Sequence, residues 1–172
     1  MNATKKELAI VKRLSDSKYN FLDANGKLLF DKWFDRLGIF SDGFARVERE
    51  GKCNLITEDG KLLSNEWFSY IDYFKDGIAR VQRSDYLWNF IDKDGKIISD
   101  EWFCWVDYFK DGIARVQRED YSYNLIDMQG NILSNEWFEW VDDFNKYDRA
   151  VVYRTNGECC KIDKQGNIVV RK

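Results

Sequence analysis

Residues 89–103 read NFIDKDGKIISDEWF, and residues 124–138, 35 positions later, read NLIDMQGNILSNEWF. Earlier copies occupy residues 54–68 and, with more differences, residues 20–34. A motif that recurs with a period of roughly 20 to 50 residues is typical of stacked structural repeats, in which no unit buries its apolar face alone. The sequence therefore predicts a short array of units that complete one another's cores.

Turn glycines keep the same period along the whole chain. They recur at intervals of 34, 35, 35 and 36 residues, at Gly26, Gly60, Gly95, Gly130 and Gly166. We place four repeats at residues 19–53, 54–88, 89–123 and 124–159, and a half repeat at residues 160–172. The half repeat is expected to complete the sheet of the fourth unit.

Each unit contains two segments whose pattern predicts strands. Residues 90–98 place apolar runs on both sides of an Asp-Gly turn, in which glycine supplies the left-handed conformation. In residues 111–118 apolar and polar side chains alternate, as in a half-buried strand. Between them, residues 99–109 fit a short helix, an irregular turn or a bent strand.

The connections between these segments are short, which favours antiparallel neighbours in an all-β fold. We expect an array of about four and a half antiparallel β-hairpin or meander repeats, each of about 35 residues. An elongated or gently curved array is the prediction, and a small closed propeller is the alternative.

Residues 1–18 lie outside the repeat and are predicted to form a helical cap. Thr4 and Glu7 have the spacing of a capping box, and Leu8, Val11 and Leu14 fall on one helical face. Such a cap would cover the open end of the first repeat.

The composition predicts a folded protein that is not embedded in a membrane. Of the 172 residues, 44% are hydrophobic and 16% are aromatic, which argues against disorder. The net charge of −3 provides no basic surface, so direct nucleic-acid binding is not expected. The apolar run at residues 8–11 is too short for a signal-peptide core or a membrane span. We therefore expect a cytoplasmic protein.

The chain has four cysteines and no histidine. The cysteines are Cys53, Cys104, Cys159 and Cys160, and their spacing matches neither a zinc site nor a disulfide framework. We expect reduced, inert thiols, no metal and no cofactor. The absence of histidine also removes the usual general base and the usual catalytic triads, so we do not expect an enzyme.

Carboxylates recur with the repeat and would align in columns when the units stack. They are Asp92, Asp127 and Asp163 in the turns, Glu66, Glu101 and Glu136 before the tryptophan, and Asp72, Asp107 and Asp142 after it. They could form weak calcium sites or a hydrolytic pair, but a catalytic carboxylate should differ from its equivalents. We favour turn chemistry and solvated faces.

Residues 88–92 read WNFID, and they are followed by a turn glycine, two apolar residues, Trp102-Phe103, and FKDGIARV at residues 109–116. This pattern resembles the WG-repeat family of bacterial β-repeat proteins, and it covers residues 19–170. The resemblance implies a β-repeat fold in proteins that are generally binding or uncharacterised, and it transfers no catalytic residue. The glycine of the family's Trp-Gly pair is replaced here by Asn20, Asn54, Asn89 and Asn124. Because asparagine tolerates left-handed backbone, we expect these residues to keep that conformation.

An arginine column is the first candidate for a binding surface. It consists of Arg46, Arg80 and Arg115. Arginine can bind carboxylates or phosphates in a bidentate manner. The alternative, which we favour, is internal pairing with the aspartates four residues earlier, Asp42, Asp76 and Asp111.

Large aromatic side chains that the repeat does not demand are the second candidate. They are Tyr70, Tyr73, Trp105, Tyr108 and Trp140, and in the sequence comparison Tyr73 and Tyr108 match Gly38 and Asp143. Exposed aromatics are enriched at interface hot spots. The tryptophans of the Trp-Phe pairs, in contrast, recur so regularly that we assign them to the core; they are Trp33, Trp67, Trp102 and Trp137.

These patterns lead us to expect a non-enzymatic module that binds another protein through an extended arginine and aromatic surface. The alternative is a small inhibitor or immunity-type protein that docks on a bacterial or phage effector, such as a nuclease or a ribonucleoprotein. Nucleic-acid or glycan binding through the aromatics, and hydrolysis by the aligned carboxylates, rank below these two hypotheses.

Overall fold

The computed structural model describes residues 8–169, and within them the protein is built from small antiparallel sheets. The strands are β1 (Ala9–Lys12), β2 (Tyr19–Leu22), β3 (Arg36–Leu37), β4 (Phe44–Arg49), β5 (Lys52–Thr57), β6 (Tyr70–Ile71), β7 (Ile78–Gln82), β8 (Trp88–Asp92), β9 (Trp105–Val106), β10 (Ile113–Gln117), β11 (Tyr123–Asp127), β12 (Trp140–Val141), β13 (Arg149–Tyr153) and β14 (Cys159–Asp163). The all-β prediction is confirmed. Across residues 8–169 no helix forms, and so none there could cross a membrane.

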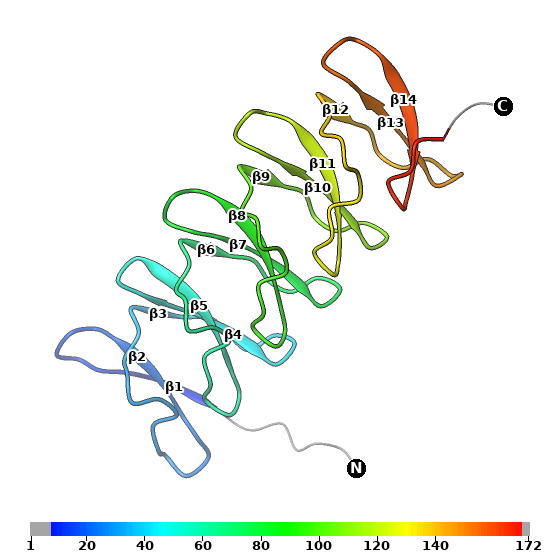
Figure 1. Cartoon of the computed structure of the whole chain (residues 1–172). Helices are drawn as coiled ribbons and strands as arrows, with labels where there is room; N and C mark the ends of the chain where they lie inside the picture. The colour runs from blue at the N-terminus through cyan, green and yellow to red at the C-terminus, as the bar shows by residue number, and fades with distance from the viewer. Residues whose placement is uncertain (1–7, 170–172) are drawn as a thin grey trace, which may run out of the picture.

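The sheets stack in chain order like the steps of a staircase (Figure 1). The β1-β2 hairpin lies at one end of the stack and the β12-β13-β14 sheet lies at the other. The array is therefore open rather than closed into a propeller. Residues 99–109, whose sequence fits three alternatives, contain the two-residue strand β9 between bends.

Each three-stranded sheet combines strands from two successive sequence repeats. In the β9-β10-β11 sheet, β9 and β10 come from the third repeat, whereas most of β11 belongs to the fourth. The chain then returns beside β11, where Phe138 and Tyr123 exchange backbone hydrogen bonds of 2.9 and 2.7 Å, before it enters β12. The final half repeat follows the same scheme, because β14 pairs with β13 and completes the last sheet.

The predicted N-terminal helical cap is wrong for the residues that the structure describes. Strand β1 replaces it and pairs with β2 in the register Ala9↔Leu22; Thr4 and Glu7, the proposed capping box, lie outside the described residues. A helix would leave the backbone of β2 unpaired along one edge, whereas an extended β1 supplies its hydrogen bonds. Leu14, which the helical pattern places on the buried face, is 90% exposed.

Side chains of the central strands point alternately to the two faces of each sheet, and each face packs against an adjacent sheet in the stack. Ala114 and Val116 of β10 are 2% and 0% exposed and pack with Phe90 of the preceding sheet. Ile113, on the opposite face of β10, packs with Val152 of the following sheet. The strand predicted over residues 111–118 is therefore confirmed for residues 113–117, which form β10. Each sheet also supplies part of the hydrophobic core of the sheets beside it.

In each Trp-Phe pair the phenylalanine belongs to the core and the tryptophan lies half-buried beside it. Phe103 is 0% exposed, whereas Trp102 is covered by the guanidinium of Arg83, 4.2 Å from the ring centroid. Trp137 lies under Arg118 in the same way, at 3.7 Å. The tryptophans that the sequence assigns to the core therefore lie at its edge: all four are half-buried, and Trp67, Trp102 and Trp137 pack against the buried clusters. They form a flanking stack with arginine, an interaction worth about 0.5–1 kcal/mol at exposed sites.

The asparagine that replaces the family's glycine is a buried clamp. Asn89 is 0% exposed; its amide nitrogen donates to the carbonyls of Ser99 and Glu101 at 2.9 and 2.8 Å, and its oxygen accepts from the Phe90 backbone at 2.7 Å. The same three bonds recur at Asn20, Asn54 and Asn124. None of the four has a positive φ, so the expected left-handed conformation is wrong. Each side chain instead ties its strand to the returning loop.

The periodic turn glycines contact the backbone of the preceding repeat. Gly130 has φ of 91°, and a Cβ atom there would overlap the carbonyl of Ile98. Gly95 and Gly166 meet Leu63 and Leu133 in the same way, whereas Gly26, in the first repeat, has open space around it. The glycines therefore permit close stacking of the repeats in addition to the left-handed turn that the sequence predicts.

Candidate functional site

Arg80 is the centre of a polar cluster between two sheets. Its Nε donates to Oδ2 of Asp72 at 2.8 Å, and a terminal nitrogen reaches the carbonyl of Val106 in the next sheet at 3.4 Å. The ring of Tyr108 lies 3.6 Å from the guanidinium, and its hydroxyl donates to Asp72 at 3.1 Å. Tyr70 also donates to Asp72, at 2.8 Å, and this hydrogen bond raises the pKa of Tyr70, which therefore keeps its proton.

Arg115 repeats this arrangement one sheet further along the array. It donates to Asp107 at 2.9 Å and to the carbonyl of Val141 in the next sheet at 3.0 Å. Trp140 lies 5.0 Å from its guanidinium, and Asp143 forms an ion pair with it at 3.4 Å. Both arginines thus tie one sheet to the next through a backbone carbonyl.

Arg46 occupies the first position of the arginine column, where no aspartate stands at the position equivalent to Asp72. Gly38 stands where the next repeat has Asp72, because Gly38 N and Asp72 N donate to the carbonyls of Arg46 and Arg80, respectively. The sequence comparison that matches Tyr73 with Gly38 is therefore wrong by one position. Within residues 8–169, Nε of Arg46 is buried without a hydrogen-bond partner.

The predicted internal pairing of the arginines is present, but the partners differ from those expected. Arg46 pairs with Glu48 at 3.4 Å, while Arg80 and Arg115 bind the aspartates described above. The expected partners Asp42, Asp76 and Asp111 occupy hairpin turns instead, with φ of 51°, 52° and 50°. Each precedes a glycine of positive φ, as a two-residue type I′ turn requires.

The predicted aromatic residues lie near this column in a row along the ends of the sheets. We define the aromatic row as Tyr70, Trp88, Trp105, Tyr123 and Trp140; its rings form two contacting groups, Tyr70–Trp88 and Trp105–Tyr123–Trp140. Its ring centroids are 5.7 Å apart for Tyr70–Trp88, 6.3 Å for Trp105–Tyr123 and 5.0 Å for Tyr123–Trp140. These are contact distances for edge-to-face aromatic pairs.

Two members of the row, Trp88 and Tyr123, are absent from the site predicted by sequence. Both immediately precede a clamp asparagine, so an aromatic at that position is the signal that could have identified them. Tyr108 lies over Arg80 instead of in the row, and Tyr73, 68% exposed, lies beside Phe74. The structure therefore brings the predicted arginines and most of the predicted aromatics into one region.

The recurring carboxylates are occupied by local bonds. Asp92 accepts backbone N–H groups from Asp94 and Lys96 at 3.0 and 2.9 Å, and Glu101 pairs with Arg118 at 2.8 Å. Among residues 8–169 no three side chains of His, Cys, Asp or Glu are arranged to hold a metal ion. Asp92 is therefore explained by its turn, and Glu101 by its ion pair.

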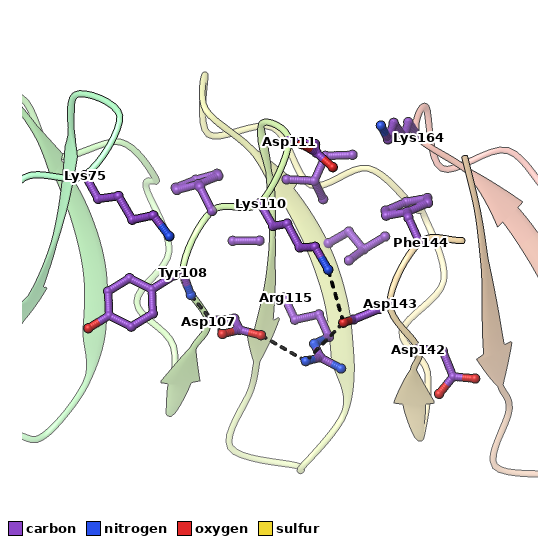
Figure 2. A pocket seen from close by; sticks show the side chains of 14 residues that line it. Lys75, Asp107, Tyr108, Lys110, Asp111, Arg115, Asp142, Asp143, Phe144 and Lys164 are labelled. Atoms are coloured by element: carbon purple, nitrogen blue, oxygen red, sulfur yellow. Dashed lines mark hydrogen bonds and ion pairs between the residues drawn. The ribbon is translucent and has the colours of Figure 1, made fainter. Parts of the chain in front are cut away.

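A pocket of about 460 Å³ opens beside Arg115, and we call it the Arg115 pocket. Its apolar lining includes Phe109, Ile113, Leu125 and Phe144. Its charged lining consists of Lys75, Lys110, Arg115, Lys164, Asp107, Asp111, Asp142 and Asp143. Figure 2 shows Tyr108 at one side of the pocket, Phe144 at the other, and Asp143 bridging to Lys110 and Arg115. Cations and carboxylates are equal in number, so the pocket carries no strong net charge.

The four cysteines are free, and their surroundings differ. Cys53 is 1% exposed, whereas Cys104 and Cys159 are exposed rather than packed; desolvation raises the pKa of the Cys53 and Cys104 thiols alike, so accessibility is what separates them. A thiol reagent such as DTNB at pH 7 should therefore modify Cys104 and Cys159 in the folded protein, and Cys53 only after unfolding. Peptide mass spectrometry would identify the sites. Labelling of Cys53 at the rate of the other two would contradict its burial.

Comparison with known proteins agrees with the repeat pattern. Residues 21–53 and 88–121 match the family described as WG containing repeat. No curated protein matches the chain significantly.

Solved structures that align with the chain include a β-propeller domain. The computationally designed Ika8 protein is 16% identical over 98% of this chain, with a TM-score of 0.38. The WD40 β-propeller domain of Doa1 is 14% identical over 96% of it, with a TM-score of 0.35. BamB from Moraxella catarrhalis is 12% identical over 98%, with a TM-score of 0.39. The chain spans 59%, 65% and 59% of these structures, respectively. The family match and the recurring motif together identify the chain as a member of the WG-repeat family.

Proposed function

We propose that this protein is a non-enzymatic repeat module that binds another protein through the aromatic row and Tyr108. The observation that supports the proposal is the exposure of large aromatics held in fixed positions. Trp105, Tyr108 and Trp140 are 38%, 45% and 39% exposed. Aromatic side chains that are already ordered lose little conformational entropy on binding, and they are enriched at interface hot spots.

The arginine column supports the proposal by fixing the aromatics rather than by offering free charges. The side chains of Arg80 and Arg115 are only 20% and 19% exposed, and both are bonded to a carboxylate and to a carbonyl of the next sheet. Their hydrogen-bonding capacity is largely used within the protein. We therefore assign the contact surface to the aromatics and a positioning role to the arginines.

The length of the row favours a macromolecular partner. Its members belong to three successive sheets, from Tyr70 in β6 to Trp140 in β12. Repeat arrays commonly use such extended faces to bind proteins. The partner would cover the aromatics and leave the polar groups between them at the rim.

Replacing Trp105 and Tyr108 together with alanine should weaken partner binding by about 1,000-fold, because each hot-spot aromatic typically contributes about 2 kcal/mol and each ~1.4 kcal/mol is a tenfold change in affinity. The tagged protein would first capture its partner from nuclease-treated lysate of its native host, with identification by mass spectrometry. Calorimetry on the purified pair would then compare the wild type with W105A/Y108A. Leu62→Ala is the control, because Leu62 is 40% exposed and lies outside the row.

Two outcomes would contradict the proposal. Unchanged affinity of the double variant, with an unchanged circular dichroism spectrum, would exclude the aromatic surface. Loss of every captured species after nuclease treatment would instead favour nucleic-acid binding, whose affinity should fall steeply with salt concentration. Unfolding of the double variant would be detected by urea denaturation, and single variants would then replace it.

A further inference from the structure

The position of Tyr108 shows what the interface between two sheets can hold. Its ring lies on Arg80 at 3.6 Å, and its hydroxyl donates to Asp72 at 3.1 Å. Nζ of Lys75 lies over the same ring, 5.8 Å from its centroid, and Phe90 lines the same narrow space. Only about 10 Å³ remains open there, so the tyrosine fills the site.

The next interface contains the same site without the tyrosine. Each group around Tyr108 has a counterpart 35 residues later, as the repeat requires. The counterparts are Asp107, Lys110, Ile113, Arg115 and Leu125, and all five line the Arg115 pocket. The pocket is therefore the tyrosine site of the preceding interface, enlarged to about 460 Å³.

Two sequence changes account for the enlargement. Asp143 stands at the position of Tyr108, and its short side chain reaches only the ion pairs with Lys110 and Arg115, at 3.6 and 3.4 Å. Leu125 stands at the position of Phe90, which packs against Phe109 with ring centroids 4.6 Å apart. Both changes replace an aromatic ring with a smaller group, so the space is left open to solvent between Phe144 and Arg115.

We propose that the Arg115 pocket receives a tyrosine side chain from the partner protein. This inference rests on the proposed function and names the chemistry of the partner's anchor residue. The ring would stack on Arg115 as Tyr108 stacks on Arg80, and its hydroxyl would donate to Asp107 as that of Tyr108 donates to Asp72. The apolar walls of Ile113, Leu125 and Phe144 would bury the remaining faces of the ring.

Tyrosine fits this pocket better than a purely apolar or a charged side chain. A leucine or phenylalanine would lack a donor for Asp107, whose carboxylate faces the site beside Arg115. A phosphate or a second carboxylate would meet Asp107 and Asp143, and a cation would meet Arg115 and Lys110. A neutral aromatic ring with one hydroxyl satisfies both the cation and the carboxylate.

Asp143→Tyr is the direct test, because it restores the side chain that fills the preceding interface. It should raise the midpoint of urea unfolding and weaken binding of the captured partner by at least about tenfold. Asp143→Ala is the matched control, since it removes the same carboxylate but leaves the pocket open. The control should retain binding, whereas equal losses in both variants would show that Asp143 itself is the contact and would overturn the proposal.

A probe tests the pocket independently of the partner. N-acetyl-L-tyrosinamide, titrated into the isotope-labelled wild type, should shift the NMR signals of Leu125 and of the Arg115 side chain, with affinity on the order of millimolar. N-acetyl-L-leucinamide should shift them less, and D143Y should not respond to either probe. No shift with the tyrosine probe, while W105A/Y108A still loses the partner, would overturn this inference and leave the proposed function standing.

Two further outcomes would overturn the assignment of the occupant. Probe binding without any captured protein would indicate a free phenolic ligand and would also remove the support for the proposed function. Concentration-dependent self-association that D143Y abolishes and D143A retains would identify a second copy of this chain as the donor of the tyrosine. Analytical ultracentrifugation of the three proteins distinguishes this case.

Discussion

Asn89→Ala should lower the free energy of unfolding by about 3 kcal/mol or more, because four backbone groups, two carbonyls and the N–H groups of Phe90 and Ser99, lose a hydrogen-bond partner. The amide of Asn89 holds the carbonyls of Ser99 and Glu101, and its oxygen holds the two N–H groups. The side chain is 0% exposed, so water does not reach it in the folded structure. Each buried group left without a partner costs about 1–3 kcal/mol, and partial relaxation of the loop reduces the sum. Urea denaturation of wild type and variant would measure the difference.

Asn135→Ala is the matched control for this prediction. Asn135 is exposed and lies in the corresponding returning loop of the next repeat, so its truncation should change the free energy of unfolding by less than about 0.5 kcal/mol. Equal effects of the two substitutions would contradict the clamp. A change in the slope of the denaturation curve would show that the array no longer unfolds as one unit, as happens in repeat proteins with weak interfaces.

The clamp marks a limit of sequence-based prediction in this chain. The sequence-based interpretation of asparagine in place of glycine rests on its tolerance of left-handed backbone, which is a local property. The amide side chain is needed instead because it donates hydrogen bonds to two carbonyls that lie ten and twelve residues further along the chain. Because the path of that loop emerges only when the sheet is assembled, the sequence period identifies the position of the clamp but not its task.

The N-terminal segment shows the opposite failure. Leu8, Val11 and Leu14 have helical spacing, but over so short a segment the pattern also fits a strand with one misplaced apolar residue. Pairing decided the outcome, because β2 offered an open edge that only extended backbone could complete. Arg13 lies over Trp33 as Arg83 lies over Trp102. Residues 9–13 are therefore structurally equivalent to the last strand of a preceding repeat.

The candidate site was predictable in its composition but not in its geometry. The sequence identified Arg80, Arg115 and Tyr108, and strong alternation indicated which strands carry the arginines. It could not show that Tyr108 crosses to the arginine of the preceding sheet. Asp143 stands at the position of Tyr108 in the next repeat, so the open pocket beside Arg115 can be understood only once that crossing is known. Contacts between stacked sheets are set by the rise and twist of the array, which a periodic sequence does not specify.

Gly130→Ala should cost about 3 kcal/mol or more, because two penalties act together. The left-handed conformation, with φ of 91°, costs a residue with a Cβ about 1–2 kcal/mol. The added methyl group would also overlap the carbonyl of Ile98 in the preceding repeat, and forced overpacking typically costs a further 1–3 kcal/mol or so. Thermal and urea unfolding would measure the loss.

Gly26→Ala separates the two penalties, because Gly26 occupies the same turn in the first repeat. Its φ is 79°, yet no atom lies within 4 Å of the position that an alanine methyl group would take, so only the conformational penalty of about 1–2 kcal/mol should remain. A larger loss for Gly130→Ala would show that the turn glycines set the spacing between repeats. Equal losses would mean that the sheets can move apart at little cost, and the Arg115 pocket, which depends on that spacing, would then lack a fixed shape.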